Sequence, residues 1–281
     1  MQVLAEILVW LNRFANVLGL VLLAPMRWLP GWLSSTIYAV LAGVIMLIVF
    51  KYTSNQKAIG RIKDQMKAGL LALKLYKDFL PVTLQSQGIL LVCAIKQLVY
   101  AVVPLAVMSL PVCLLLAQMG LWYQVRPLQS GEQTLVVATL NSEKNTPWPQ
   151  IGLDLPAGAQ TLVGPCLVNK DRQEVWWSVQ AGEAGHDGLA ITIAGERFEK
   201  EFVVTTELER VSALRPARRW LDLLLHPWET PFATDSRVQS IEVTYPPRRS
   251  FTHGTNHWVI YFFIVSIVGA FLFKPFFNVK I

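Results

Sequence analysis

Three long stretches of this 281-residue sequence contain no charged side chain. They cover residues 33–50, 97–118 and 258–273, and each is rich in Leu, Val, Ile or Phe. A helix needs about 20 apolar residues to cross the roughly 30 Å hydrocarbon layer of a bilayer. The absence of charge therefore predicts three membrane-spanning helices, of which the third needs its flanking residues to reach full length.

Cysteines and catalytic motifs are also scarce. Cys166 is the one cysteine of three that lies away from the apolar stretches, so it has no partner for a disulfide within that region. No Walker A, G-x-S-x-G, G-x-G-x-x-G or H-E-x-x-H pattern is present. His253 and His257 have the i, i+4 spacing of metal ligands, but no Cys, Asp or Glu lies at matching spacing. We expect no metal, no cofactor and no enzyme activity, with a lipid or cell-wall enzyme as the weaker alternative.

The basic residues are concentrated in one segment. Residues 51–96 carry eight Lys or Arg and two acidic residues, whereas residues 119–257 carry thirteen basic and sixteen acidic residues. Cytoplasmic loops of membrane proteins collect Lys and Arg in this way. Because the net charge of +6 has this local origin, we expect no nucleic-acid partner. The pattern predicts a bacterial inner (plasma) membrane protein, with the N-terminus and residues 126–250 outside and the C-terminus in the cytoplasm.

The basic segment has the pattern of a helical hairpin. Apolar residues from Ile59 to Leu73 recur at helical spacing, after the helix-capping candidates Ser54 and Asn55. Pro81 is expected to separate this helix from a second one, which continues into the second span. The basic side chains of the first helix form a candidate cytoplasmic contact. They are Arg61, Lys63, Lys67, Lys74 and Lys77.

Residues 2–24 are apolar but are interrupted by Glu6, Asn12, Arg13 and Asn16. The apolar positions follow helical spacing, and most of the polar ones lie off that stripe. This pattern favours an amphipathic helix that lies in the membrane interface. A fourth complete crossing is the alternative.

Residues 126–250 alternate between apolar and polar residues in short runs, with turn residues between them. Turns are expected at 185–188 and at Gly195-Glu196, and one ring of the Trp176-Trp177 pair is expected in a core. Strands at about ten-residue spacing predict an all-β, immunoglobulin-like sandwich. The expected strands are Thr134–Leu140, Glu174–Val179, Leu189–Ala194, Phe198–Thr205 and Val238–Tyr245.

Lys96 is the most informative single residue, because a charge at the end of a membrane span is often functional. The prolines of the second span are expected to bend it and so to open a hydrophilic groove. A lysine that extends its ammonium group to the interface is the alternative. The candidate groove residues are Lys96, Gln97, Pro104, Pro111 and Gln118.

Arg218, Arg219 and Trp220 begin a short, basic, amphipathic segment in residues 215–228. They are a candidate contact with the outer membrane surface or with a partner. A helix that packs on the sandwich is an equally good interpretation.

The membrane region resembles the core of YidC/Oxa-type membrane insertases, and more closely their small three-span relatives. Residues Lys51–Gln118 and Trp258–Phe273 carry the likeness, which lies in topology and charge pattern. The resemblance implies a cytoplasm-facing groove for nascent membrane proteins, with Lys96 near the place of the groove's basic residue. The β domain between the last two spans departs from these relatives. The alternative is a structural or accessory subunit of a larger membrane complex, which binds a partner through its extracytoplasmic β domain.

The expected partners are therefore the lipid bilayer and either nascent membrane proteins or other membrane subunits. The expected regions are an interfacial amphipathic helix (1–32), a first span (33–50), a cytoplasmic basic helical hairpin (51–96), a second span (97–122), an extracytoplasmic β-sandwich (126–250), a third span (257–274) and a cytoplasmic tail (275–281).

Overall fold

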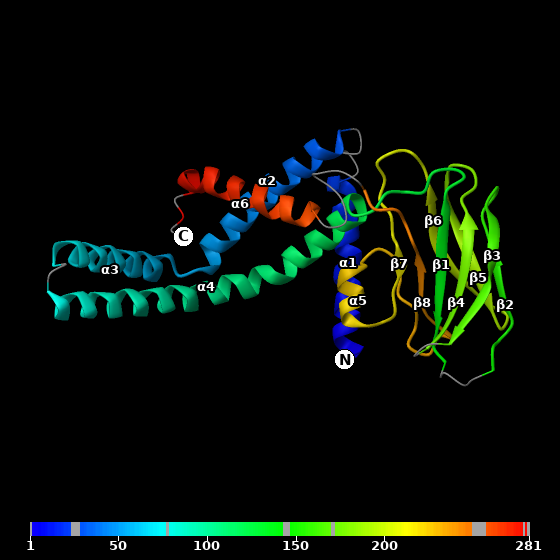
Figure 1. Cartoon of the computed structure of the whole chain (residues 1–281), viewed down its shortest axis with the longest axis horizontal. Coiled ribbons are helices and arrows are strands. Elements are labelled where there is room, and N and C mark those ends of the chain that lie inside the picture. The colour runs from blue at the N-terminus through cyan, green and yellow to red at the C-terminus, as the bar shows by residue number, and fades with distance from the viewer. Residues whose placement is uncertain are drawn as a thin grey trace. The chain divides into compact units, whose positions relative to one another are not determined.

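The computed structural model describes residues 2–23, 29–76, 79–142, 147–169, 172–248, 257–277 and 279. These residues form a mixed helix and sheet fold (Figure 1). The chain divides into two compact units. The strand unit comprises Met1–Ser35 and Cys113–Tyr261, and the helical unit comprises Thr36–Val112 and Phe262–Ile281.

Four helices among the described residues are long and apolar enough to cross a membrane. Three of them contain the uncharged stretches that predicted spans. The fourth, at the N-terminus, qualifies over Glu6–Leu23, so a fourth crossing is compatible with its length and composition. The four helices are α1 (Gln2–Leu23), α2 (Gly31–Thr53), α4 (Leu80–Tyr123) and α6 (Trp258–Phe277).

Helix α3 (Gln56–Leu75) and the first part of α4 form the predicted hairpin (Figure 1). The Asn55 side chain caps α3, because its Oδ1 accepts a hydrogen bond from the Ala58 amide at 3.1 Å. Pro81 lies in the first turn of α4, where no helical acceptor exists for its missing N–H. As predicted, α4 then continues without a break through Pro104 and Pro111.

Helices α2 and α6 approach each other closely at two glycines. A Cβ atom added to Gly43 would lie 2.1 Å from the carbonyl oxygen of Ser266. A Cβ atom added to Gly269 would lie 3.2 Å from the Cα atom of Val40. Small residues at such crossings are the usual means by which apolar helices pack in membranes.

The strand unit contains two sheets with antiparallel ladders. The larger sheet has the order β3-β4-β1-β8-β7, and the smaller has the order β2-β5-β6. The strands are β1 (Gln133–Leu140), β2 (Ile151–Asp154), β3 (Gln160–Asn169), β4 (Gln173–Gln180), β5 (Gly185–Ile193), β6 (Glu196–Val204), β7 (Leu214–Arg215) and β8 (Val238–Val243).

Both sheets contribute to one apolar core. Val136 of β1 and Trp177 of β4 belong to the same buried cluster as Ile191 of β5 and Phe202 of β6. Burial alternates strictly along β1 and β4, which is the pattern of strands that pack on one face. The predicted contrast within the tryptophan pair is confirmed, because Trp177 is buried and Trp176 lies half-buried on the opposite face.

Three strands, β2, β3 and β7, were not predicted, and one predicted turn is wrong. β7 has two residues and nearly every side chain of β3 is exposed, so neither shows an alternation to recognise. Residues 185–188 form the start of β5 rather than a turn, because His186 pairs with Val203 in the ladder. The hairpin turn is Ala194-Gly195, one residue earlier than predicted, with φ angles of 49° and 85°. Two positive φ angles fit a type I′ turn.

Candidate functional site

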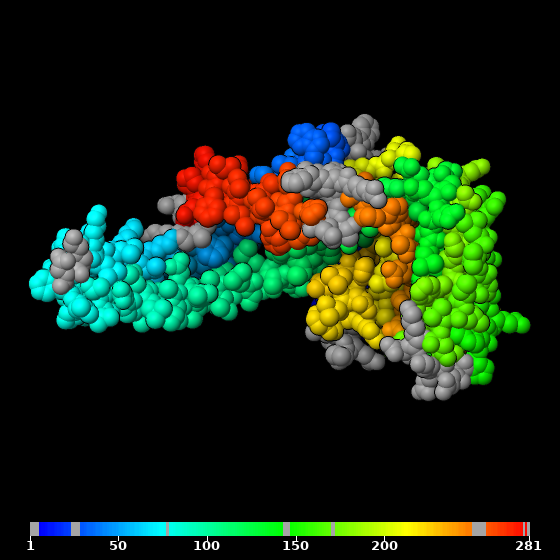
Figure 2. All heavy atoms as spheres, in the orientation of Figure 1, coloured from blue at the N-terminus to red at the C-terminus, as the bar shows by residue number. Residues whose placement is uncertain are grey.

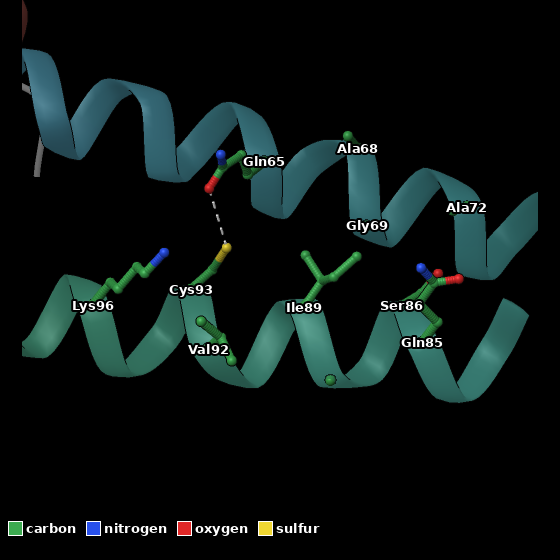
Figure 3. A pocket seen from close by; sticks show the side chains of 11 residues that line it. Gln65, Ala68, Gly69, Ala72, Gln85, Ser86, Ile89, Val92, Cys93 and Lys96 are labelled. Atoms are coloured by element: carbon green, nitrogen blue, oxygen red, sulfur yellow. Dashed lines mark hydrogen bonds between the residues drawn. The ribbon is translucent and has the colours of Figure 1, made fainter.

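A groove lies between α3 and the first part of α4, within the helical unit (Figure 3). Its volume is about 740 Å³, and small or uncharged side chains form most of its lining. The lining residues are Gln65, Ala68, Gly69 and Ala72 of α3, and Gln85, Ser86, Gly88, Ile89, Val92, Cys93 and Lys96 of α4.

Small residues bring the two helices together and also leave the groove open. A Cβ atom added to Gly69 would lie 3.2 Å from Leu90 Cδ2, so this glycine is at the helix contact. A Cβ atom added to Gly88 would meet no atom of the described chain within 4 Å, so this glycine faces the open space. The Cys93 thiol donates to Gln65 Oε1 at 3.6 Å and links the helices across the groove (Figure 3).

Lys96 lies at one end of the groove, one turn after Cys93 (Figure 3). Its side chain is exposed, and it is the only charged residue in the sequence of α4 from Leu80 to Tyr123. The groove thus combines apolar and amide surface with a single positive charge. This arrangement can bind an apolar segment and contact a carboxylate or carbonyl at one end.

Of the five candidate groove residues, Lys96 lines this groove and the other four do not. They are Gln97, Pro104, Pro111 and Gln118. Gln118 follows Lys96 by six turns of helix, and its Nε2 donates to Asn16 Oδ1 of α1 at 2.6 Å. The groove therefore belongs to the hairpin, on the N-terminal side of Lys96, and not to the second apolar stretch.

The predicted basic contact on α3 lies outside the groove lining. Arg61, Lys67 and Lys74 are exposed, and Lys77 lies outside the described residues. Lys63 is half-buried. Partial burial lowers the pKa of Lys63, and the nearby charges of Lys274 in α6 and of Lys67 lower it further. Basic residues of α3 and α6 are therefore neighbours in the helical unit.

Arg218, Arg219 and Trp220 are all exposed, at the start of the short helix α5 (Trp220–Leu225). The Arg218 guanidinium lies 3.5 Å from the Glu6 carboxylate of α1. Helix α5 also packs on α1, because Leu223 and Leu8 share a buried cluster. The packing partner of this segment is thus α1.

The strand unit also contains a buried lysine that the sequence patterns did not indicate as a site. Lys200 of β6 is 1% exposed, and its Nζ donates to Glu229 Oε1 and to the Ser212 carbonyl at 2.5 Å each. It also donates to the Glu201 carbonyl at 3.3 Å. Burial lowers the pKa of Lys200, and the Glu229 carboxylate opposes that effect. Since an ammonium group has three protons to donate, the contacts satisfy it and fit a structural role.

A simple signal could have located this lysine. Phe198, Lys200 and Phe202 alternate along one strand, so they share a face. Because Phe202 is buried in the core, that face points inward, and the lysine must find partners there. The identity of Glu229 as its partner was not readable from local pattern.

No group of three or more His, Cys, Asp or Glu side chains among the described residues is placed to hold a metal ion. His253, one of the two histidines with i, i+4 spacing, lies outside those residues. Comparison of the chain with protein-family models, curated proteins and solved structures finds no match.

Proposed function

We propose that this protein is a non-enzymatic integral membrane protein that receives apolar segments of other membrane proteins, as an insertase or membrane chaperone does. The α3–α4 groove is the observation that carries the proposal. Its small lining residues let an apolar helix approach the backbone closely, as Gly and Ala do at helix contacts in membranes. Lys96 gives the groove one charged end.

The hairpin also exposes many large apolar side chains. Leu75 of α3 and Leu84, Leu91 and Ile95 of α4 are each more than half exposed. Burial of one such side chain contributes about 1.5–3 kcal/mol, so a hairpin that stayed bare in water would forgo a large stabilisation. Contiguous exposed apolar surface of this kind marks a contact with protein or lipid.

We infer that α2, α4 and α6 cross the membrane. The 22 positions from Lys96 to Gln118 in α4 rise about 33 Å in a straight helix, close to the roughly 30 Å of hydrocarbon. The earlier residues of α4 then lie beyond the membrane together with α3. The proximity of Lys63 to Lys274 supports a single basic, cytoplasmic side.

We propose that this is a bacterial inner-membrane protein with the N-terminus and the strand unit outside the cytoplasm, because the basic segment favours the cytoplasmic side. The two antiparallel sheets around one core support an immunoglobulin-like sandwich for that unit. The resemblance to YidC/Oxa-type insertases remains a proposal that rests on topology and charge.

Filling the groove tests the proposal most sharply. Gly88 lines the groove, and a Cβ atom added to it meets no described atom within 4 Å, so Gly88→Leu adds bulk there and Gly88→Ala is the matched control. In cells depleted of the native protein, we expect the alanine variant to restore the membrane proteome and the leucine variant to leave client proteins uninserted. Complete restoration by Gly88→Leu would contradict the proposal.

The charge at the end of the groove is tested separately. We expect Lys96→Met to reduce the insertion of some client proteins. The substitution removes the positive charge that contacts a carboxylate or carbonyl group of the bound segment. Lys57→Met removes an exposed lysine of α3 that neither lines the groove nor belongs to the candidate cytoplasmic contact, and it should have no effect. Equal effects of the two substitutions would assign the role to overall charge instead.

A second candidate function is an accessory subunit that binds an extracytoplasmic partner. β3 lies at the edge of the larger sheet and exposes Leu162, Val163 and Leu167. An apolar sheet edge is a favourable place for another chain to bind. Purification in mild detergent should then retain a stoichiometric partner, which Val163→Lys should release. A native protein that purifies alone would exclude this candidate.

A further inference from the structure

Helix α1 has two opposite faces of different character. One face is exposed and apolar along the whole helix, with large side chains every three or four residues. The opposite face is covered and includes the polar residues Asn12 and Asn16. The exposed stripe consists of Ile7, Trp10, Phe14, Val17 and Val21.

The covered face of α1 is fastened to α5 and to the loop that follows it. Asn12 Nδ2 donates to the Leu223 carbonyl at 2.6 Å, and Asn16 Nδ2 donates to the Pro227 carbonyl at 2.9 Å. Leu8 packs on Leu223 one turn earlier. The contact therefore extends over the first two-thirds of α1, well into its middle.

The loop after α5 is in turn fixed to the sheet by charged groups. Glu229 forms the ion pair with Lys200 of β6. The Arg210 guanidinium stacks on the Trp228 ring at 3.3 Å and pairs with Glu201 of β6 at 3.0 Å. The middle of α1 is thus tied to a polar, charged surface of the strand unit.

These contacts distinguish a helix α1 that spans the membrane from a helix α1 that lies in the membrane plane. A spanning helix would hold its middle near the centre of the bilayer and would carry the attached strand unit with it. Sheet edges, loops and ion pairs do not lie in hydrocarbon, because their polar groups find no water there. The middle of α1 must therefore lie at the level of the membrane surface.

We propose that α1, together with α5, is an in-plane membrane helix that attaches the strand unit to the outer surface of the bilayer. Its exposed apolar stripe lies at the boundary between the lipid headgroups and the acyl chains. Its covered face packs on α5 and on the loop that follows α5. The inference requires membrane insertion but not the groove function, so either can fail alone. It also explains why a helix long enough to span carries asparagines at its centre.

The partner surface is a lipid membrane with anionic headgroups. Helix α5 adds the exposed side chains of Trp220, Leu221 and Leu225, and it lies at the molecular surface (Figure 2). Arg13 of α1 and Arg219, the N-cap residue of α5, are exposed cations. Tryptophan at the interface and arginine beside phosphate are the features of helices that lie in the membrane plane.

The contact between α1 and α4 agrees with this placement. A Cβ atom added to Gly19 of α1 would lie 2.5 Å from Gln118 Oε1, and Asn16 also binds Gln118. Gln118 lies about one turn of helix before the end of the second span expected at residues 97–122. Helix α1 therefore contacts α4 near the outer end of that span, which is where a helix in the membrane plane would meet it.

Spin labels on the exposed stripe test the proposal without disturbing the contacts. Cysteines replace Ile7, Trp10, Phe14, Val17 or Val21 one at a time, in the full chain with its native cysteines changed to serine. The labelled protein is placed in nanodiscs of phosphatidylethanolamine and phosphatidylglycerol. Collision rates with oxygen and with a nickel chelate then report the depth of each label. Leu98 and Leu105, exposed positions of α4, are the spanning controls.

An in-plane α1 predicts the same depth for all five labels, within about one helical pitch of 5 Å, just below the headgroups. A spanning α1 predicts depths that change by up to about 10 Å between the middle and the ends of the stripe. That gradient would overturn the proposal, and so would labels that collide freely with the nickel chelate as in water. The two α4 controls should differ by about 10 Å in either case.

Discussion

The two sheets of the strand unit bury their large apolar side chains, whereas the helical unit exposes many of them. In the strand unit, Val136, Trp177 and Ile241 are buried in one core formed by both sheets. In the helical unit, residues such as Ile45 of α2 and Leu272 of α6 are exposed along helices that carry almost no charge. The sheets form a core of their own, whereas the helical unit leaves much apolar surface uncovered within the described chain.

Each unit should therefore respond differently to substitution. A change in the strand unit should act through core packing and buried charge. A change in the helical unit should act through helix contacts and the exposed surface. Four substitutions, three of them paired with a comparison variant, separate these effects.

The largest effect is expected at the tryptophan pair. Trp177→Ala should lower the free energy of unfolding of the strand unit by about 3–5 kcal/mol, because it leaves a cavity in the core. Trp176→Ala, on the opposite face, should cost less than about 1 kcal/mol. Denaturant unfolding of the full chain in micelles, followed by near-ultraviolet circular dichroism, measures both. Equal costs would contradict the assignment of the two faces.

Lys200→Ala should cost nearly as much, about 3–5 kcal/mol, because it leaves the Glu229 carboxylate largely buried without its partner. Arg197→Ala is the matched control in the same strand, since the Arg197–Glu199 pair is exposed and worth at most about 1 kcal/mol. The same unfolding measurement applies. A cost for Lys200→Ala as small as the control's would mean that water reaches the pair.

In the helical unit, Gly43→Ala should cost about 1–3 kcal/mol, because the new methyl group would overlap the Ser266 carbonyl. Gly88→Ala should be neutral or stabilising by up to about 1 kcal/mol, since alanine favours helix and meets open space. Loss of helical circular dichroism during titration with sodium dodecyl sulfate compares the two variants. A stable Gly43→Ala protein would show that α2 and α6 do not pack as described.

The smallest effect is expected at the β5–β6 turn. Ala194 has a φ of 49°, which strains a residue that carries a Cβ atom. Ala194→Asn creates the Asn-Gly pair preferred in type I′ turns and should stabilise the strand unit by about 0.5–1 kcal/mol. Thermal unfolding detects a change of this size. No gain, or a loss, would argue against this turn geometry.

Local patterns predicted much of the fold. The uncharged stretches located α2, α4 and α6, the Asn55 cap located the start of α3, and alternation located five strands and Trp177. These features depend on neighbours within a few residues, which periodicity reports directly.

The sites depend on contacts between distant residues, which local patterns do not report. The groove is set by Gly69 and Gly88, which carry no hydrophobic signal in a sequence. Lys200 and Glu229 are 29 positions apart, and Asn12 lies 211 positions from its partner Leu223. No periodicity links residues at such separations, so their pairing requires the fold.

Two native cysteines offer the most direct test of the contrast between the sheets and the apolar helices. Cys166 is exposed on β3, and Cys113 is exposed in the apolar part of α4. A membrane-impermeant maleimide applied to intact spheroplasts should modify Cys166 from outside, whereas lipid should protect Cys113 until the membrane is dissolved and the protein is denatured. Modification of Cys113 as fast as Cys166 in intact membranes would contradict the insertion of α4. Modification of Cys166 only after the spheroplasts are broken would contradict the outward position of the strand unit.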